Sequence, residues 1–405
     1  MKKNILLIIA SSLLCLGVVG CTPNSSSEAP SSEPSSQVEV KSSITLEVYD
    51  EPIDFHTEIQ KNYLKSGDPS ILSSDIKGKD EFSLPKPVTL TWEDSKECSS
   101  YSVMISENEN MSNSKRFFTS EKTVDIYNLK IDTTYYWRVI QSVKDGETSS
   151  IGSFKTMDYG PRNLYVDGVT NVRDVGGWMT SEGSRTQQGI LFRGGRLNNS
   201  YPTGWEKGGD DTGYTYEKEI TEDGEDVYLK EMGIKTEIDF RTRDRNGYPG
   251  TTDSNENLFP TVAGTQYISI EMDGGADVKE NKDGIKKLFE ILANKDNYPI
   301  YYHCNIGTDR TGMVTYLINA LCGVGQQDLY YDYMFSNFGL IALPSPQVTN
   351  PKRKELTDLI TGSGTANRVN NYEGSTLQEK ARACLLDCGV SESNIDAVYN
   401  IMLGK

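Results

Sequence analysis

One ten-residue segment constrains the fold of this chain more than any other feature of its sequence. Residues 303–312 read HCNIGTDRTG and lie between an apolar run at 299–303 and a helical pattern at 311–321. The apolar run predicts a buried strand, and a strand that turns directly into a helix is typical of an α/β domain. Other predicted elements of this domain are strands at 233–241 and 267–270 and helices at 286–292 and 376–386, with Ser391 as a possible cap of a last helix.

The same segment contains a potential nucleophile at the start of an anion-binding loop. Cysteine is nucleophilic only as a thiolate, and its pKa falls at a helix N-terminus and beside cationic groups. Successive backbone N–H groups at such a turn, together with the helix dipole, bind a dianion. With Cys304 as the nucleophile, the predicted phosphate-binding positions are Asn305, Ile306, Gly307, Thr308, Asp309 and Arg310.

Residues around the cysteine complete a plausible catalytic set. Arg310 lies six residues after Cys304, and its planar guanidinium suits two phosphate oxygens at once. Thr311 can offer a hydroxyl to the thiolate, and His303 can fix the loop by hydrogen bonding. The set predicts two-step phosphoryl transfer through a phosphocysteine that water hydrolyses. It requires no metal and no cofactor.

The proton donor for the leaving group is open between three aspartates. Asp309 lies in the loop itself, whereas Asp273 follows a predicted strand and is flanked by glycines that could act as a hinge. We rank Asp309 slightly above Asp273, with Asp277 as the third candidate.

The pattern Cys-x5-Arg followed by Thr resembles the signature of cysteine-based phosphatases. Four further segments resemble elements of bacterial atypical tyrosine and dual-specificity phosphatases, some of which act on lipids. These segments are NVRDVGG at 171–177, LFRGGRL at 191–197, IDFR at 238–241 and Asp332-Tyr333. The resemblance covers most of residues 160–405. It implies a tyrosine-phosphatase-like domain at 158–405, with a central sheet flanked by helices.

The resemblance also implies the substrates. Family members act on phosphotyrosine, and some act on phosphoserine, phosphothreonine or phosphoinositides. Those with broad or lipid specificity often carry a lysine before the Asp of the signature, where this chain has Thr308. The expected partner is therefore a phosphorylated protein or peptide first, and a phosphorylated inositol lipid or soluble inositol phosphate second.

Two roles remain open for three arginines of the predicted α/β domain. Arg173, Arg193 and Arg241 could line the site, or they could form structural ion pairs with Asp174 and Asp239. The cysteines outside the signature have a simpler interpretation, since a disulfide between Cys384 and Cys388 on one helix face has poor geometry. We expect Cys322, Cys384 and Cys388 to be packed in the core.

The N-terminus has the pattern of an exported, lipid-anchored protein. Two lysines precede an apolar run that ends in LGVVGC, which resembles a bacterial lipobox with Cys21 as the lipidated residue. We expect a signal peptide at 1–20 and a flexible tether at 21–43, which is rich in Ser and Pro. The predicted location is extracytoplasmic, with membrane attachment through the lipid alone.

Residues 84–157 predict an all-β domain ahead of the α/β domain. Runs at 88–92, 101–105 and 129–139 alternate apolar and polar residues, which indicates half-buried strands. With Trp92 as a core tryptophan, the segment resembles an immunoglobulin-like sandwich of the fibronectin type III class. Residues 44–83 have no assignment.

Charge excludes one class of partner. The chain has 41 basic and 58 acidic residues, a formal net charge of −17, which opposes binding of a nucleic-acid backbone. Only two histidines are present, so a His-rich metal cluster is not expected. The acidic stretch at 205–226 is interpreted as a solvated surface loop, with a calcium loop as the alternative.

We therefore predict a cysteine-dependent phosphatase that hydrolyses phosphomonoesters, foremost protein phosphotyrosine, with dual specificity as the extension of this activity. A phosphoinositide or inositol-phosphate phosphatase is the second enzymatic hypothesis. A non-catalytic surface adhesion protein and a thiol redox protein are hypotheses of other classes. The intact Cys/Arg/Thr set argues against the first of these, and the absence of a Cys-x-x-Cys pair argues against the second.

Overall fold

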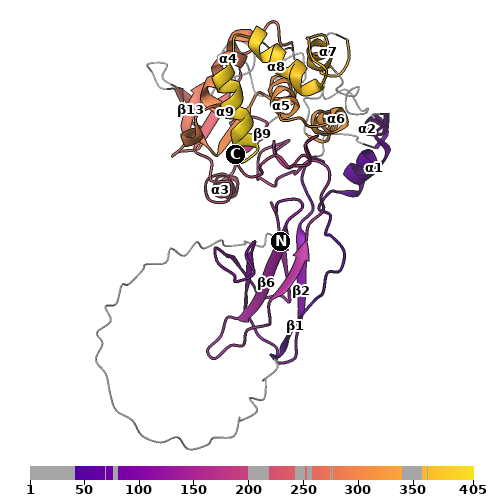
Figure 1. Cartoon of the computed structure of the whole chain (residues 1–405). Coiled ribbons are helices and arrows are strands. Elements are labelled where there is room, and N and C mark those ends of the chain that lie inside the picture. Colours follow the sequence, from indigo (N-terminus) through magenta and orange to yellow (C-terminus); the bar gives the residue numbers. More distant parts are fainter. Residues whose placement is uncertain are drawn as a thin grey trace, which may run out of the picture. The chain divides into compact units, whose positions relative to one another are not determined.

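A computed structural model describes most of the chain beyond residue 41. The described residues are 42–68, 70–75, 81–198, 219–241, 251–252, 258–273, 275, 277–339, 358–362 and 364–405. They form two compact units (Figure 1). The chain passes between the units at five points, after Ile53, Pro87, Ile126, Asp132 and Thr156.

The first unit consists of two antiparallel sheets. One has the order β1-β2-β5, with β1 at Ile44–Leu46, β2 at Val88–Asp94 and β5 at Thr123–Ile126. The other has the order β4-β3-β6-β7, formed by Lys115–Thr119, Tyr101–Ser106, Thr134–Gln141 and Gly152–Lys155. Side chains of β2 and β6 alternate between buried and more exposed positions, as the period-two runs predict. Trp92 lies in the core, as expected, edge-on to Tyr101.

The second unit is built on a five-stranded, mainly parallel sheet of order β13-β10-β14-β9-β8. Its strands are Gln266–Ser269, Thr236–Asp239, Ile300–His303, Leu191–Gly194 and Arg173–Asp174. Strand β14 is central and runs parallel to both β10 and β9, whereas β8 is antiparallel to β9. All four residues of β14 are buried, as its apolar sequence predicts for a strand covered on both faces.

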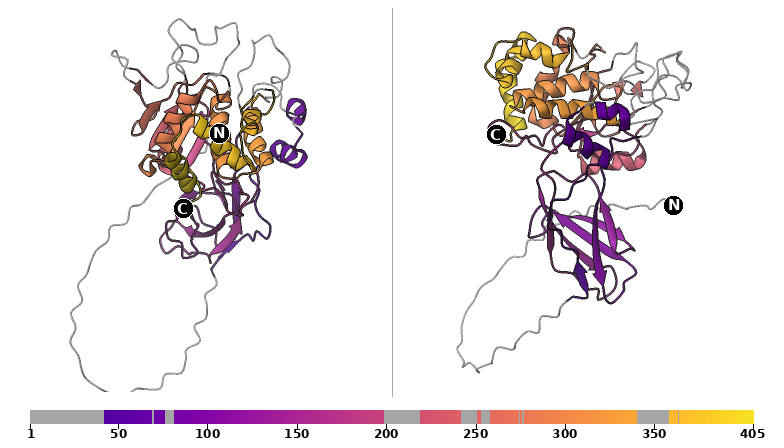
Figure 2. Two further views of the ribbon diagram at one scale, coloured as in Figure 1. Left: turned by 45° about the horizontal axis from the view of Figure 1, so that its top comes forward. Right: turned by 90° about the vertical axis from the view of Figure 1, so that its right-hand side faces the viewer.

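Helices complete this unit (Figures 1 and 2). Helix α5, Asp309–Leu321, follows β14 and is buried from Arg310 to its last residue, so it is the central helix. It contacts α6, α7, α8 and α9, which span Gln326–Met334, Thr365–Asn370, Leu377–Asp387 and Glu392–Met402. Helix α4, Lys282–Leu292, packs against α9. Shorter elements are α3 at Glu222–Asp226, a π-helix at Val227–Glu231, 3-10 helices at Lys295–Asn297 and Phe335–Phe338, and the pair β11 and β12 at Thr251–Thr252 and Leu258–Phe259.

The predicted helix ends agree with the caps in the structure. Helix α8 begins at a capping box of Thr376 and Glu379, and the Ser391 hydroxyl accepts the Asn394 N–H at the start of α9. Cys322, Cys384 and Cys388 are buried free thiols of the core, as expected.

Residues 54–87 do not stand apart from the second unit but belong to it. Helix α1, Glu58–Ser66, has a capping box at Thr57 and buries the Tyr63 ring against Tyr331, Phe335 and Phe338. Helix α2, Ser70–Asp75, adds Leu72 to the same core. The apolar residues of this segment are few and have polar neighbours in the sequence, so no helix was predicted here. The units therefore divide the unassigned stretch at 44–83 between them, and residues 127–132 also join the second unit.

Two of the sequence predictions fall on parts of the chain that the structure does not describe. The signal peptide, Cys21 and most of the tether precede residue 42, and most of the acidic stretch at 205–226 lies within 199–218. In the described part of the chain, no helix combines the length and the hydropathy needed to cross a membrane.

Candidate active site

The loop after β14 meets the ends of its neighbouring strands at one edge of the sheet. Register places Asp239 of β10, His303 of β14 and Gly194 of β9 side by side. Cys304 follows at once, and α5 begins at Asp309. Parallel strands thus bring the residues after each of them together, as in other α/β proteins where ligands bind outside the carboxyl ends of the strands.

Gly307 allows the loop to turn this tightly. Its φ is +70°, a conformation that residues with a side chain rarely adopt. A Cβ at this position would lie 2.3 Å from the Gly194 carbonyl oxygen. The loop therefore packs backbone against backbone on the end of β9.

Donors on the outside of the loop hold its carbonyl groups. His303 Nδ1 lies 2.9 Å from the carbonyl oxygen of Cys304, and the Arg196 N–H donates to the carbonyl of Asn305 at 3.0 Å. The Asn171 amide donates to the carbonyls of the next two residues, Ile306 at 3.0 Å and Gly307 at 3.1 Å.

Arg193 adds a second donor to the Gly307 carbonyl at 2.6 Å. Four consecutive carbonyls are thus held by groups outside the loop. The backbone N–H groups of Asn305, Ile306, Gly307 and Thr308 have no acceptor among the described residues. This arrangement leaves them for an anion, as in other backbone anion-binding turns.

Cys304 is almost fully buried at the base of this loop. Burial by itself would raise the pKa of the thiol, but the positive charge of Arg310 and hydrogen bonding from the Thr311 side chain and backbone outweigh it. The pKa of Cys304 is therefore lowered, although the nearby charge of Asp309 works in the opposite direction. The site favours a thiolate, which is the reactive form.

Arg310 crosses the site, and only part of its guanidinium group forms hydrogen bonds. Its Nη1 donates to the carbonyl of Phe240 at 3.1 Å and lies 3.5 Å from that of Met272. Its Nε is buried and has no partner among the described residues. Among the described residues, the buried Thr308 hydroxyl also has no partner. Buried donors without partners are costly, so such a cluster indicates a place for a polar ligand.

His303 is locked between two acceptors. Its Nε2 lies 3.0 Å from Oε1 of Glu237, opposite the carbonyl that its Nδ1 contacts. Burial lowers the pKa of His303, but the charges of Asp239 and Glu237 and the Glu237 hydrogen bond raise it above its usual value overall. An imidazolium satisfies both acceptors at once. The structure places the His303 ring against the loop backbone, and its role in fixing the loop stays a prediction.

Arg173 and Arg193 share one buried carboxylate. Arg173 Nε donates to Asp332 Oδ1 at 2.9 Å, and Arg193 Nη1 donates to Oδ2 of the same residue. Both arginines and Asp332 are at most 4 % exposed. Asp332 comes from α6. Arg173 thus forms a structural ion pair, one of the two alternatives offered by the sequence, but with Asp332 and not with nearby Asp174, which pairs with Arg162.

Arg241 forms the ion pair that sequence analysis offered as one alternative. Its Nε and Nη2 donate to the Asp239 carboxylate at 2.7–3.0 Å, and its Nη1 donates to Asn198. Arg241 and Asp239 are fully buried. Burial opposes their ionisation, but their mutual attraction lowers the pKa of Asp239 and raises that of Arg241.

The structure separates the three candidate acids. Asp309 is the first residue of α5, close enough to Cys304 to influence its thiol. Asp273 is exposed and follows Met272, whose carbonyl faces Arg310. Asp277 accepts a hydrogen bond from Arg368 at 2.7 Å and another from the Lys279 N–H. Although burial acts against it, these contacts lower the pKa of Asp277, so it is a poor acid at neutral pH.

Sequence analysis missed three residues of the site: Glu237, Asn171 as a contact of the loop, and Asp332 as the partner of two arginines. A charged residue at the centre of a predicted buried strand was the signal for Glu237. No local signal indicated the pairing of Asp332, which comes from a helix far along the chain from both arginines.

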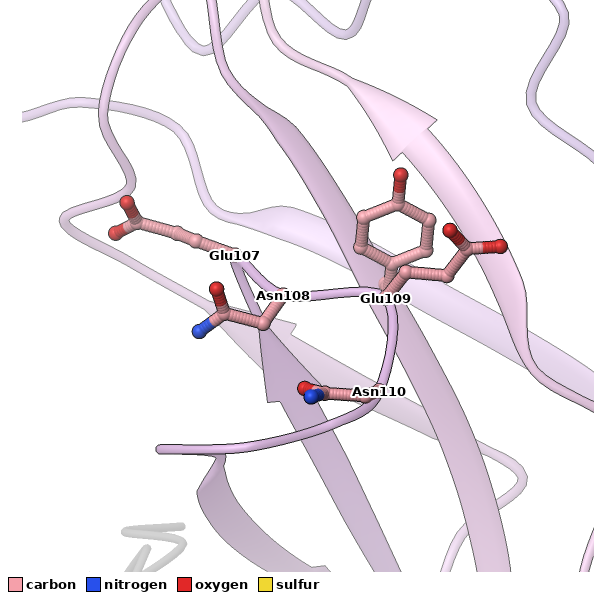
Figure 3. A pocket seen from close by; sticks show the side chains of 5 residues that line it. Glu107, Asn108, Glu109 and Asn110 are labelled. Atoms are coloured by element: carbon pink, nitrogen blue, oxygen red, sulfur yellow. The ribbon is translucent and has the colours of Figure 1, made fainter.

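A separate hollow lies on the first unit (Figure 3). Its lining consists of Glu107, Asn108, Glu109, Asn110 and Tyr136. It has no nucleophile and no basic group, so it offers no second site for phosphate chemistry. In the described part of the chain, no group of three His, Cys, Asp or Glu residues is arranged to hold a metal ion.

Comparisons with known proteins point to one family. The family model described as the tyrosine phosphatase family matches residues 164–210 and 217–383, which is more than half of the chain. A provisional tyrosine-protein phosphatase of Cupriavidus necator is 24 % identical over 207 residues, covering 44 % of this chain and 64 % of that protein. A tyrosine-protein phosphatase of Nostoc commune is 24 % identical over 123 residues, 27 % of this chain and 42 % of that one. The chain thus spans less than two thirds of these relatives.

Among solved structures, the core catalytic domain of the PP-IP phosphatase Siw14 of S. cerevisiae, in complex with citrate, is similar over 38 % of this chain and 76 % of that one. The identity is 19 % and the TM-score 0.25. The family match and the two curated relatives support the prediction of a phosphatase enzyme. With a match over more than half its length, the chain belongs to the tyrosine phosphatase family.

Proposed function

We propose that this chain is a cysteine-dependent phosphatase that hydrolyses phosphomonoesters through a phosphocysteine intermediate. The observation that supports it most directly is the buried Cys304 thiol, whose pKa is lowered by Arg310. The thiol precedes a loop in which the N–H groups of residues 305–308 have no acceptor among the described residues. A tetrahedral dianion would meet the backbone donors and the unpartnered Nε of Arg310.

Catalysis would proceed in two displacements. The Cys304 thiolate attacks phosphorus, the bond from phosphorus to the ester oxygen breaks, and the leaving oxygen takes a proton from an aspartic acid. Water then attacks phosphorus and gives its proton to the aspartate, which restores the aspartic acid. The P–S bond breaks, and inorganic phosphate leaves with Cys304 restored as thiolate. Arg310 and the loop N–H groups stabilise the charge of the equatorial oxygens in both steps.

We propose Asp309 as the general acid, with Asp273 second. Asp309 lies at the start of α5 beside the thiol, whereas Asp273 is exposed on the segment that follows Met272. Asn substitution at each separates them. The variant of the true acid loses most activity on esters with poor leaving groups, and full rates of both variants on alkyl phosphates would exclude both assignments.

Protein phosphotyrosine is the substrate class that we propose first. In the described part of the chain, Arg173, Arg193 and Arg241 are occupied by carboxylates, and Arg196 pairs with the Asn305 side chain. Arg310, whose printed contacts are the carbonyls of Phe240 and Met272 and not a carboxylate, keeps its charge for one phosphoryl group. A polyphosphorylated inositol would need further cations, so it is the second candidate.

Phosphate release in EDTA tests the proposal. The substrates are a phosphotyrosine peptide, a phosphoserine peptide and a phosphatidylinositol phosphate. Phosphate release should disappear in Cys304→Ser and persist in Cys322→Ser. The second variant is a matched control, because Cys322 is also a buried free thiol of the second unit. Equal release by wild type and Cys304→Ser would refute the mechanism, and the preferred substrate decides between the two classes.

We further propose that Cys21 is lipidated and holds the enzyme outside the membrane, with the first unit as an immunoglobulin-like spacer. The lipobox-like sequence supports the anchor, and the two antiparallel sheets support the spacer. Labelling of cells with a radioactive fatty acid should mark the wild-type chain and leave Cys21→Ala unlabelled.

A further inference from the structure

We infer that Ser83 is a positioning residue of the phosphate-binding loop, acting through Asn171. Ser83 lies well before residue 164, where the match to the family begins. Its hydroxyl accepts the Asn171 N–H at 2.9 Å, and the Asn171 side chain holds the carbonyls of Ile306 and Gly307. The inference rests on the phosphatase proposed above.

Contacts on both its backbone and its side chain fix Asn171. Its φ is +60°, a left-handed conformation that asparagine adopts more readily than most other residues with a side chain. Its side-chain oxygen accepts a hydrogen bond from Arg173, so the amide group is fixed at both ends. A shift of its N–H would carry the amide away from both loop carbonyls, and the N–H groups of the loop would turn with those carbonyls.

Ser83 is itself fixed by contacts on every side. Its hydroxyl donates to Glu81 Oε1 at 2.6 Å, and Glu81 Oε2 accepts the Thr170 hydroxyl at 2.5 Å. Thr170 directly precedes Asn171, so Glu81 and Ser83 hold two consecutive residues. Ser83 is 3 % exposed, so water does not compete for these bonds.

The backbone on both sides of Ser83 is anchored to the core. The Gln60 amide of α1 donates to the carbonyls of Phe82 at 2.7 Å and Leu84 at 3.3 Å. The Phe82 N–H donates to the carbonyl of Phe338 at 2.9 Å. Gln60 of α1 therefore holds the residues on either side of Ser83, and hydrogen bonds lead from Ser83 through Asn171 to the loop that follows Cys304.

The test compares Ser83→Ala with Ser149→Ala in the full chain. Ser149 is a matched control in the first unit: it is buried, its hydroxyl accepts the Val139 N–H at 3.0 Å and donates to a carbonyl at 2.6 Å. Ser83→Ala should lower kcat about tenfold and weaken orthovanadate inhibition by a similar factor, the cost of about one buried hydrogen bond. Ser149→Ala should change neither, and Ser83→Thr, which keeps the hydroxyl, should recover most of kcat.

Equal kcat and vanadate inhibition in Ser83→Ala and Ser149→Ala would overturn the inference while the phosphatase stands. A wild-type chain without phosphatase activity would overturn both. If Ser83→Ala does not fold, Glu81→Gln replaces it, because it weakens the hold on Ser83 and Thr170 without removing the hydroxyl. That variant should lose kcat and vanadate affinity in parallel, and unchanged values would contradict the inference.

Discussion

Neutralising Asp332 should destabilise the second unit far more than an ordinary charge substitution. Asp332→Asn keeps the shape of the side chain, but it leaves Arg173 and Arg193 without their shared carboxylate. Both arginines are at most 1 % exposed, so water cannot replace the lost charge. Burial and the charge of Arg193 already lower the pKa of Arg173 to about 10, despite the opposing effect of Asp332.

The size of the effect follows from that burial. Removing one partner of a buried ion pair costs about 3–5 kcal/mol, because the remaining charge is uncompensated. A matched control is Asp396→Asn, whose partner Arg382 is 36 % exposed and which is itself 58 % exposed. An exposed pair of this kind contributes about 0–1 kcal/mol.

Hydrogen exchange followed by mass spectrometry measures both variants in the unit concerned. Peptides from β9 and α6, which carry Arg193 and Asp332, should lose protection by two or more orders of magnitude in Asp332→Asn and change little in Asp396→Asn. kcat should fall as well, since Arg193 also holds the Gly307 carbonyl. A loss below about 1 kcal/mol in these peptides would refute the reasoning that the carboxylate compensates two buried charges.

Three further predictions follow from the same contacts. Gly307→Ala should abolish activity, at least a hundredfold in kcat, since a Cβ at this φ of +70° would clash with backbone; steady-state kinetics and vanadate binding check this. The rate at which iodoacetate alkylates Cys304 should rise with pH around a midpoint below that of an ordinary thiol. The reason is that a thiol of lowered pKa is still a thiolate at lower pH. Arg310→Ala should raise that midpoint, and Cys322, whose pKa burial raises to about 12, should stay unreactive near neutral pH. The isolated segment 158–405 lacks α1 and α2, so its circular dichroism should show no cooperative unfolding transition. A fragment that unfolds cooperatively and is active would contradict the boundaries of the second unit.

Much of the site could be predicted because its chemistry lies in one short stretch. Cys304, Arg310 and Thr311 come from a single strand–loop–helix step, so local spacing largely determines their separation. The predictions that failed or stayed open concern groups from distant segments. Arg173 pairs with Asp332 rather than with its neighbour Asp174, because the ends of β8, β9 and α6 converge in the folded unit.

By itself, the sequence predicted the α/β character of the second unit, strands at 88–92, 101–105 and within 129–139, and the residues at the centre of the proposed chemistry. Strand and helix periodicities and a nucleophile at a helix start are local properties, and they are readable without any long-range contact. Only the tertiary structure decided that Glu237 contacts His303, that Asp332 pairs with two arginines, and that Ser83 accepts the N–H of Asn171. Each of these depends on burial and on parallel strand register, which bring together groups that are far apart along the chain and make their partners obligatory once water is excluded.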